Sequence, residues 1–156
     1  FTGAGFRVYP KRSKRLTNRK EIKPIASIEI TFKREHIVTK NIEFNTLFGL
    51  GSYFTAGEEY LFLKDTLKKD LIVYFENQTI VKHSLEKSTS DESSNNYVKA
   101  VSAINYIDFK NFSYLLLVKF LIYLLMHKVI GFKDFYKKFK EGAKAINECK
   151  NLTKLL

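Results

Sequence analysis

A nearly unbroken apolar run over residues 112–126 constrains the fold of this chain more than any other feature. Lys119 is the only charged residue inside it, and Lys110, His127 and Lys128 bound it. A helix that crosses a bilayer needs about 20 mostly apolar residues, so this run is short for a span. It fits either a helix that lies against a membrane surface or a partner, or a helix buried in a core.

A strongly basic helix is predicted directly after this run. Gly131 separates the two segments, and residues 132–150 carry an apolar side formed by Phe135, Phe139 and Ile146. The opposite side is rich in lysine. A basic amphipathic helix beside an apolar one is typical of proteins at an anionic membrane face. With a further helix over 97–106, we expect residues 97–156 to form a helical, membrane-associating region.

Positive charge is in excess and gathers toward the two ends of the chain. The formal net charge is +11 over 156 residues, which favours a polyanionic partner. Eight Lys and Arg residues fall within residues 7–23 against one acid, Glu21, without helix or strand periodicity. We expect residues 1–23 to form a basic arm or loop. It serves either as a clamp for phosphate groups or as a solvated surface loop.

Cysteine content and the start of the sequence indicate the cellular compartment in which the protein is expected. Cys149 is the single cysteine, so an internal disulfide and a cysteine-based metal site are excluded. A basic stretch, and no apolar leader, follows residues 1–5. Both features favour a cytoplasmic protein, which we expect at the inner face of the cell membrane. The length of 156 residues favours one compact domain.

The middle of the chain predicts short strands, helices and one distinctive loop. The β-branched and aromatic residues 25–32 predict a strand, and residues 33–38 predict a short helix. Residues 44–57 contain the three glycines Gly49, Gly51 and Gly57. Glycine allows tight turns and close approach of the backbone to a ligand, so this loop is a candidate binding segment.

The next segment predicts a helix followed by two strands. Glu58 and Glu59 open the helix, in the turn where acids complement the helix dipole. Its buried stripe consists of Tyr60, Leu63 and Leu67. Residues 71–75 and 79–82 predict the two strands, and His83 stands at the end of the second. A polar, serine-rich loop is expected before the helical region.

In order and spacing, residues 25–32, 42–51, 57–63 and 80–83 resemble the second half of bacterial family 2 (GT-A fold) glycosyltransferases. In that family a strand leads into a glycine-rich loop, a Gly-Glu-Asp-like motif opens a helix, and a later strand ends in histidine. The resemblance covers less than half of the chain. It implies an α+β fold, in which residues 24–96 form the acceptor-side part of an incomplete GT-A-like domain.

The resemblance also implies catalytic residues. Sugar transfer with inversion needs a carboxylate that takes the proton of the acceptor hydroxyl, and charge stabilisation for the departing diphosphate. The acid pair of the family falls on Glu58 and Glu59, and its base falls on Glu59. The family more often has Asp at this second position, so Glu58 stays a candidate. Without the surrounding loop, the two acids would only complement the dipole of a helix.

Further site residues follow from the same resemblance. Gly49, Gly51 and Gly57 fall in the loop that would bind the acceptor. His83 falls where related enzymes approach the metal or the diphosphate, and imidazole is a suitable ligand for Mn²⁺. The alternative for His83 is a surface histidine at a strand end.

One half of such an enzyme is missing from this sequence. The family holds its divalent metal, Mn²⁺ or Mg²⁺, mainly through an Asp-x-Asp motif in a nucleotide-binding first half. No Asp-x-Asp occurs here, and too few residues precede Pro24 for a βαβ unit. We expect this half to lie upstream or in a separate chain, and the chain to be inactive alone.

The implied partners are a nucleotide-sugar donor and a glycan or lipid-linked acceptor, as in cell-surface polysaccharide assembly. An anionic membrane surface is a further expected partner. The main alternative class is a nucleic-acid-binding module, because a charge of +11 can dominate non-specific affinity. No helix-turn-helix, zinc-finger or RNA-binding aromatic motif supports it. The other alternative is a membrane-peripheral domain without catalysis.

Overall fold

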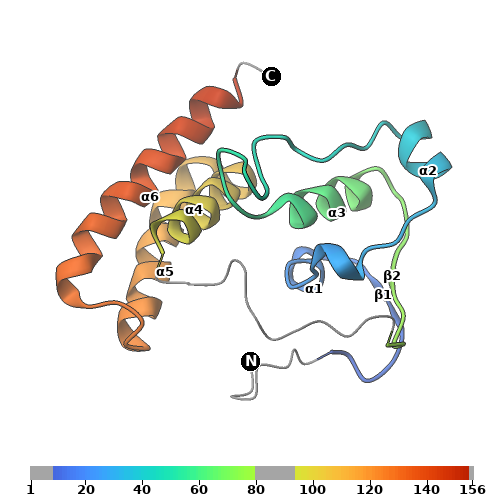
Figure 1. The fold of residues 1–156 in the computed structure, drawn as a ribbon, viewed down its shortest axis with the longest axis horizontal. Coiled ribbons are helices and arrows are strands. Elements are labelled where there is room, and N and C mark those ends of the chain that lie inside the picture. Colours follow the sequence, from blue (N-terminus) through green and yellow to red (C-terminus); the bar gives the residue numbers. More distant parts are fainter. Residues whose placement is uncertain (1–8, 80–93, 155–156) are drawn as a thin grey trace. The chain divides into compact units, whose positions relative to one another are not determined.

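The chain is an α+β protein in which helices predominate (Figure 1). A computed structural model describes residues 9–79 and 94–154. Within these residues the chain forms two compact units. The first consists of residues 9–45 and 58–79, and the second of residues 46–57 and 94–154. The expected α+β class is confirmed, and the sheet in the described part of the chain has two strands.

The first unit contains that sheet. Strand β1 (Lys14–Leu16) pairs antiparallel with β2 (Val73–Phe75). Hydrogen bonds extend the pairing beyond the strands. Ser13 Oγ donates to Glu76 Oε1 at 2.6 Å, and the Asn77 N–H donates to Ser13 Oγ at 2.9 Å. Strand β2 is shorter than the strand predicted over 71–75.

The basic segment before residue 24 is more ordered than the sequence indicates. After β1, the short helix α1 (Arg19–Ile22) begins at Asn18, whose side-chain oxygen accepts two backbone N–H groups at 3.0 and 3.3 Å. Leu16 and Ile22 are buried. The expectation of an irregular arm is therefore wrong for residues 14–22, because a capping asparagine and two apolar side chains attach this segment to the unit.

The strand predicted over 25–32 is also wrong. The structure has the 3₁₀ helix η1 (Ser27–Glu29) there, flanked by irregular backbone. Glu29 Oε2 accepts the N–H of Ala26 at 2.7 Å, and this local bond favours the turn over the extended chain. The short helix expected next is confirmed as α2 (Arg34–Thr39).

Helix α3 (Glu58–Lys68) provides the core of the first unit and begins at the acid where the sequence predicts its start. Its buried residues are Tyr60, Leu61, Phe62, Leu63 and Thr66. The ring of Phe62 stacks on that of Phe44, with centroids 4.3 Å apart, and contacts Phe32 at 5.4 Å. Asp70, at a φ of 59°, turns the chain toward β2.

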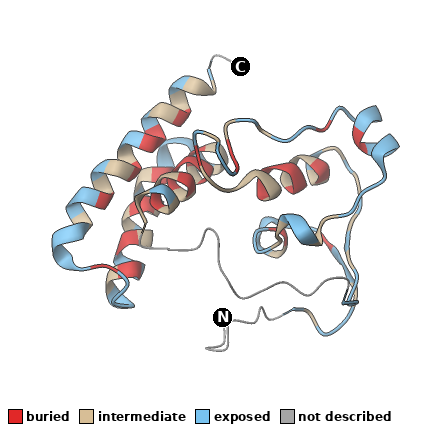
Figure 2. Cartoon of the chain, in the orientation of Figure 1, coloured by how far each residue is buried: buried red, intermediate tan, exposed pale blue. Residues whose placement is uncertain are grey.

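The second unit is built on three helices, α4 (Asn95–Phe109), α5 (Ser113–Met126) and α6 (Phe132–Leu152). Each contacts the other two. Figure 2 shows buried residues along all three. The three helices predicted by the sequence are confirmed, and α4 is longer than the predicted 97–106.

Helices α4 and α5 are separate. Lys110, with φ at 53°, ends α4, and the 3₁₀ helix η2 (Lys110–Phe112) leads into α5. Taken as one segment, Asn95–Met126 is long and apolar enough to cross a membrane by length and composition alone. Within it, 22% of an apolar stretch of 18 residues is buried in the structure. The 14 residues of α5 extend about 21 Å, less than the hydrocarbon core of a bilayer, about 30 Å.

Candidate functional site

The glycine loop predicted by the sequence is present at residues 46–57 and requires its glycines. The φ angles are 120° at Gly49, 78° at Gly51 and 109° at Gly57. L-residues rarely adopt such backbone conformations. Any other residue at these three positions would therefore strain the backbone of the loop.

Two aromatic residues hold this loop in place. Phe48 and Phe54 are buried, and their rings stack with centroids 4.9 Å apart. The Gly49 N–H donates to the Phe54 carbonyl at 2.9 Å, and the Phe54 N–H donates to the carbonyl of Leu47 at 2.9 Å. Gly51, at the tip, is exposed, and a Cβ placed on it would have no atom within 4 Å. The tip is therefore open to a ligand.

Further contacts join the loop to the helices of its unit. The Tyr53 phenol hydrogen-bonds to Glu148 of α6, and this bond, with some burial, raises the pKa of Tyr53. At Gly57, a Cβ would lie 2.3 Å from Ile104 Cδ1 of α4. Ile104 is buried, so the close approach of α4 requires glycine at this position.

The two acids singled out by the sequence lie in the first turn of α3. Glu58 and Glu59 are both partly buried. The structure places them in the first unit, whereas Gly49, Gly51 and Gly57 belong to the second. The prediction that these acids begin a helix is confirmed. Their joint action with the glycine loop stays a prediction.

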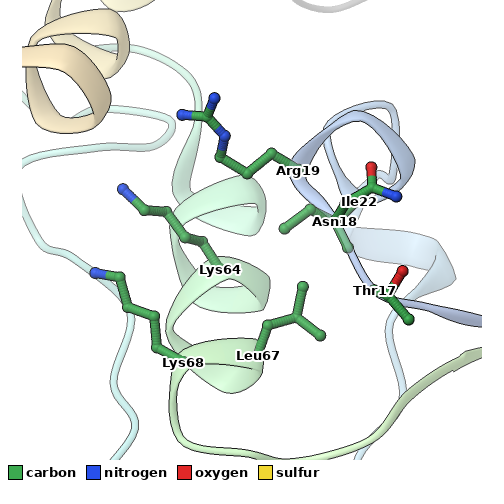
Figure 3. Close-up of a pocket in the computed structure, with 7 residues that line it drawn as sticks. All are labelled: Thr17, Asn18, Arg19, Ile22, Lys64, Leu67 and Lys68. Carbon is green, nitrogen blue, oxygen red and sulfur yellow. The ribbon is translucent and has the colours of Figure 1, made fainter.

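The first unit contains a pocket that the sequence analysis does not predict. Its volume is about 300 Å³, and it lies between α1 and α3 (Figure 3). Its lining consists of Thr17, Asn18, Arg19, Ile22, Lys64, Leu67 and Lys68. The three cationic side chains extend toward the same side in Figure 3, and Lys68 Nζ forms an ion pair with Asp65 at 3.3 Å. The cationic groups therefore stand at the rim of a mostly apolar pocket.

The pocket and the acid pair point away from each other on α3. Five residues separate Glu59 from Lys64, which turns the side chains about 140° apart around the helix axis. The acids and the cationic rim are therefore separate features of the same helix. Lys64 and Lys68, one turn apart, were the only sequence signal for the pocket, and nothing in the pattern linked them to Arg19.

A metal site is not formed by the part of the chain that the structure describes. Within residues 9–79 and 94–154, no group of three His, Cys, Asp or Glu side chains is placed to hold an ion. His83, the residue that the sequence proposes as a metal ligand, lies outside these residues, as do residues 80–82 of the strand expected over 79–82. The role of His83 stays a prediction.

Cys149 is not placed to act as a nucleophile. Its side chain is fully buried, and its thiol donates to the Ala103 carbonyl at 3.7 Å. Burial raises the pKa of this thiol to about 11. Because the thiolate is the reactive form, a neutral buried thiol is inert at physiological pH.

Comparison with known proteins does not identify the chain. No protein-family model, no curated protein and no solved structure matches it. The geometry itself offers an ordered glycine loop, an acid pair that opens α3 and a cation-rimmed pocket. A function has to be argued from these features and from the order of the motifs along the chain.

Proposed function

We propose that this chain is the acceptor-side part of a glycosyltransferase that uses a nucleotide-sugar donor. One observation carries this proposal. Helix α3 begins at Glu58, directly after a loop whose three glycines all have positive φ, so the acid pair stands in the first helical turn. The order of loop, acid pair, helix and strand β2 is the order in the family that the sequence resembles.

The acid pair is suited to act as a general base. In the proposed reaction, the acceptor hydroxyl attacks the anomeric carbon of the donor sugar while the bond from that carbon to the diphosphate oxygen breaks. The hydroxyl proton passes to the carboxylate of Glu59, or alternatively of Glu58. Both residues are partly exposed, while the Oε2 atom of Glu58 is buried. Their place in the first turn of α3 complements the helix dipole.

In the same proposal, the glycine loop contacts the acceptor. The tip at Gly51 has no neighbour within 4 Å of a Cβ position, so a sugar ring can approach the backbone closely. The buried pair Phe48 and Phe54 keeps this tip in one conformation. An ordered loop loses little entropy when it binds its ligand.

The diphosphate and its divalent cation need groups beyond this acid pair. By the resemblance, we assign the nucleotide and its Mn²⁺ or Mg²⁺ mainly to a nucleotide-binding half of the kind that the family has. When bound, the cation would offset the charge of the leaving diphosphate. The residues of this chain would bind and deprotonate the acceptor.

The test uses the protein with this upstream or partner half present. Release of nucleoside diphosphate from a panel of sugar nucleotides is measured for the parent and for Glu58→Gln and Glu59→Gln. We expect at least one variant to lose about 10²–10⁴-fold in turnover, with unchanged thermal unfolding and donor binding. Glu35→Gln is the matched control, because Glu35 also lies in the first turn of a helix, α2. Near-normal turnover in both Glu58→Gln and Glu59→Gln would rule out the assigned base.

A further inference from the structure

Helix α5 is apolar on the face that it exposes as well as on the face that it buries. Leu117, Leu121 and Leu124 are buried in the second unit. On the opposite side, Leu115, Ile122 and Met126 are exposed, and Met126 is 75% exposed. Spacings of seven and four residues place these three within about 40° of one another around the helix. A helix that is apolar all round is normally covered on every side.

Exposed apolar side chains also precede and follow α5. Phe112 precedes the helix, while Phe132 and Tyr136 follow the turn at 127–131 in the first two turns of α6. All three are exposed, and Phe132 is 83% exposed. We call the following set the apolar face: Phe112, Leu115, Ile122, Met126, Phe132 and Tyr136. A concentration of large apolar side chains of this kind marks a binding surface.

Lysines accompany the apolar face throughout. Asp134 is the only acid between residues 110 and 140. The exposed lysines of this segment are Lys110, Lys119, Lys128, Lys133, Lys137 and Lys140. Lys119 lies within the exposed stripe of α5, and Lys140 Nζ stands 4.8 Å from the ring centroid of Tyr136. The surface that contacts the apolar face therefore has to be apolar and negatively charged.

We propose that the apolar face binds the surface of a bilayer that contains anionic lipids. Aliphatic side chains would enter the boundary between headgroups and acyl chains, while the lysines reach the lipid phosphates along their flexible stems. This inference is independent of the proposed transferase activity. It assigns a membrane partner to the second unit whether or not the acid pair of the first unit is catalytic.

The chemistry of the face favours a membrane over other partners. A second copy of this chain would bring two lysine-rich surfaces together, and like charges across an interface oppose association. Single-stranded nucleic acid is held by aromatic rings on which bases stack. The centre of the apolar face is instead aliphatic, with Leu115, Ile122 and Met126, and its aromatic members Phe112, Phe132 and Tyr136 lie before and after α5. An aliphatic stripe flanked by aromatic rings and lysines matches a lipid surface best.

Tryptophan fluorescence at the start of α6 gives the sharpest test, because the chain contains no tryptophan of its own. Phe132→Trp introduces a single reporter at the most exposed apolar position of the face. With vesicles of phosphatidylcholine and phosphatidylserine, we expect its emission to shift to shorter wavelength and to be quenched by brominated acyl chains. Val38→Trp is the matched control, since Val38 is 66% exposed in α2 of the first unit. No shift for Phe132→Trp, or an equal shift for Val38→Trp, would overturn the proposal.

Co-sedimentation of the full chain with the same vesicles tests the face independently. The double variant Ile122→Ser/Met126→Ser changes only exposed positions, and we expect it to bind about tenfold more weakly. Its control is Val38→Ser/Ile72→Ser, which removes two exposed aliphatic side chains from the first unit. Unchanged circular dichroism spectra establish that each variant is folded. Vesicle binding by Ile122→Ser/Met126→Ser at the parent level would contradict the proposal.

The charge requirement is tested with Lys119→Gln and Lys133→Gln. Each lysine near an anionic surface strengthens binding about fivefold, so the double variant should lose more than tenfold. Vesicle binding by the parent protein should be weakened to a similar extent by high salt, and by the use of vesicles that contain phosphatidylcholine alone. Equal binding to neutral and anionic vesicles would overturn the proposal. The proposal would also be overturned if substitutions in the apolar face abolished self-association in sedimentation experiments, or abolished RNA binding, and left vesicle binding unchanged.

Discussion

Gly142 of α6 and Leu117 of α5 approach so closely that a Cβ on Gly142 would lie 2.6 Å from Leu117 Cδ1. The same Cβ would lie 2.8 Å from the Ser102 Oγ of α4. Leu117 and Ser102 are both buried, so an added Cβ would force these side chains to shift within the core. Gly142 is therefore the point at which all three helices of the second unit meet.

We expect Gly142→Ala to destabilise the second unit. Overpacking of a dense core costs about 1–3 kcal/mol, whereas replacing a helical glycine by alanine recovers at most about 1 kcal/mol. Chemical denaturation measures the net loss. Gly131→Ala is the matched control, because its Cβ would meet nothing closer than 3.6 Å and Gly131 precedes α6. Equal stability of Gly142→Ala and the parent would show that the helices can separate at this point.

Ile22 should be essential for order in the basic N-terminal segment. It is fully buried, and Ile→Ala in a core costs about 2–5 kcal/mol. We expect Ile22→Ala to release this segment and to accelerate tryptic cleavage among the basic residues 11–23. The control is Ile28→Ala, because Ile28 is exposed. Fast cleavage of the parent protein would instead support the mobile arm that the sequence suggests.

The helices were predictable where their periodicity is strong and their ends carry local signals. Helix α3 begins at Glu58 as expected, and Gly131 separates α5 from α6 as expected. Residues 25–32 were wrongly predicted because their β-branched composition indicates a strand, while one hydrogen bond from Ala26 to Glu29 favours a 3₁₀ turn. Strand propensity has little effect without a neighbouring strand.

The candidate site was only partly predictable, because some of its features depend on local sequence and others on the packing of distant segments. Positions of the acids and glycines follow from local sequence, because helix starts and positive φ angles are local properties. The pocket lies between α1 and α3, and its lining brings together Arg19 and Lys64, which lie far apart in the sequence, so no periodicity predicts it. Within residues 14–22, Leu16 and Ile22 are the buried residues, too few to form a hydrophobic pattern.

Cys149 should make the stability of the second unit sensitive to alkaline pH. Burial raises the pKa of its thiol from 9.0 to about 11, so the fold favours the neutral form. This contribution is complete below pH 9, where both states keep the proton. It is lost as pH rises from 9 to about 11, because only the unfolded chain releases the proton in that range.

We expect the free energy of unfolding to fall less steeply with pH over this range in Cys149→Ala than in the parent. Alkylation of the parent by iodoacetamide at neutral pH should be slow unless denaturant is present. Denaturation midpoints across the pH range and the rate of alkylation measure the two effects. Rapid alkylation of the folded protein would contradict full burial of the thiol.

The glycine loop offers a pair of variants that separates backbone strain from steric overlap. Gly51→Ala adds a Cβ at a φ of 78° with no atom within 4 Å, so its cost is strain alone, about 1–2 kcal/mol. Gly57→Ala adds a Cβ at a φ of 109° and 2.3 Å from Ile104 Cδ1. We expect Gly57→Ala to lower the thermal unfolding temperature clearly more than Gly51→Ala does. Ile104→Ala itself loses core packing, but in its background Gly57→Ala should cost less than in the parent, because the overlap is gone and only the strain remains. Equal unfolding temperatures for the two single variants would show that α4 does not require glycine at position 57.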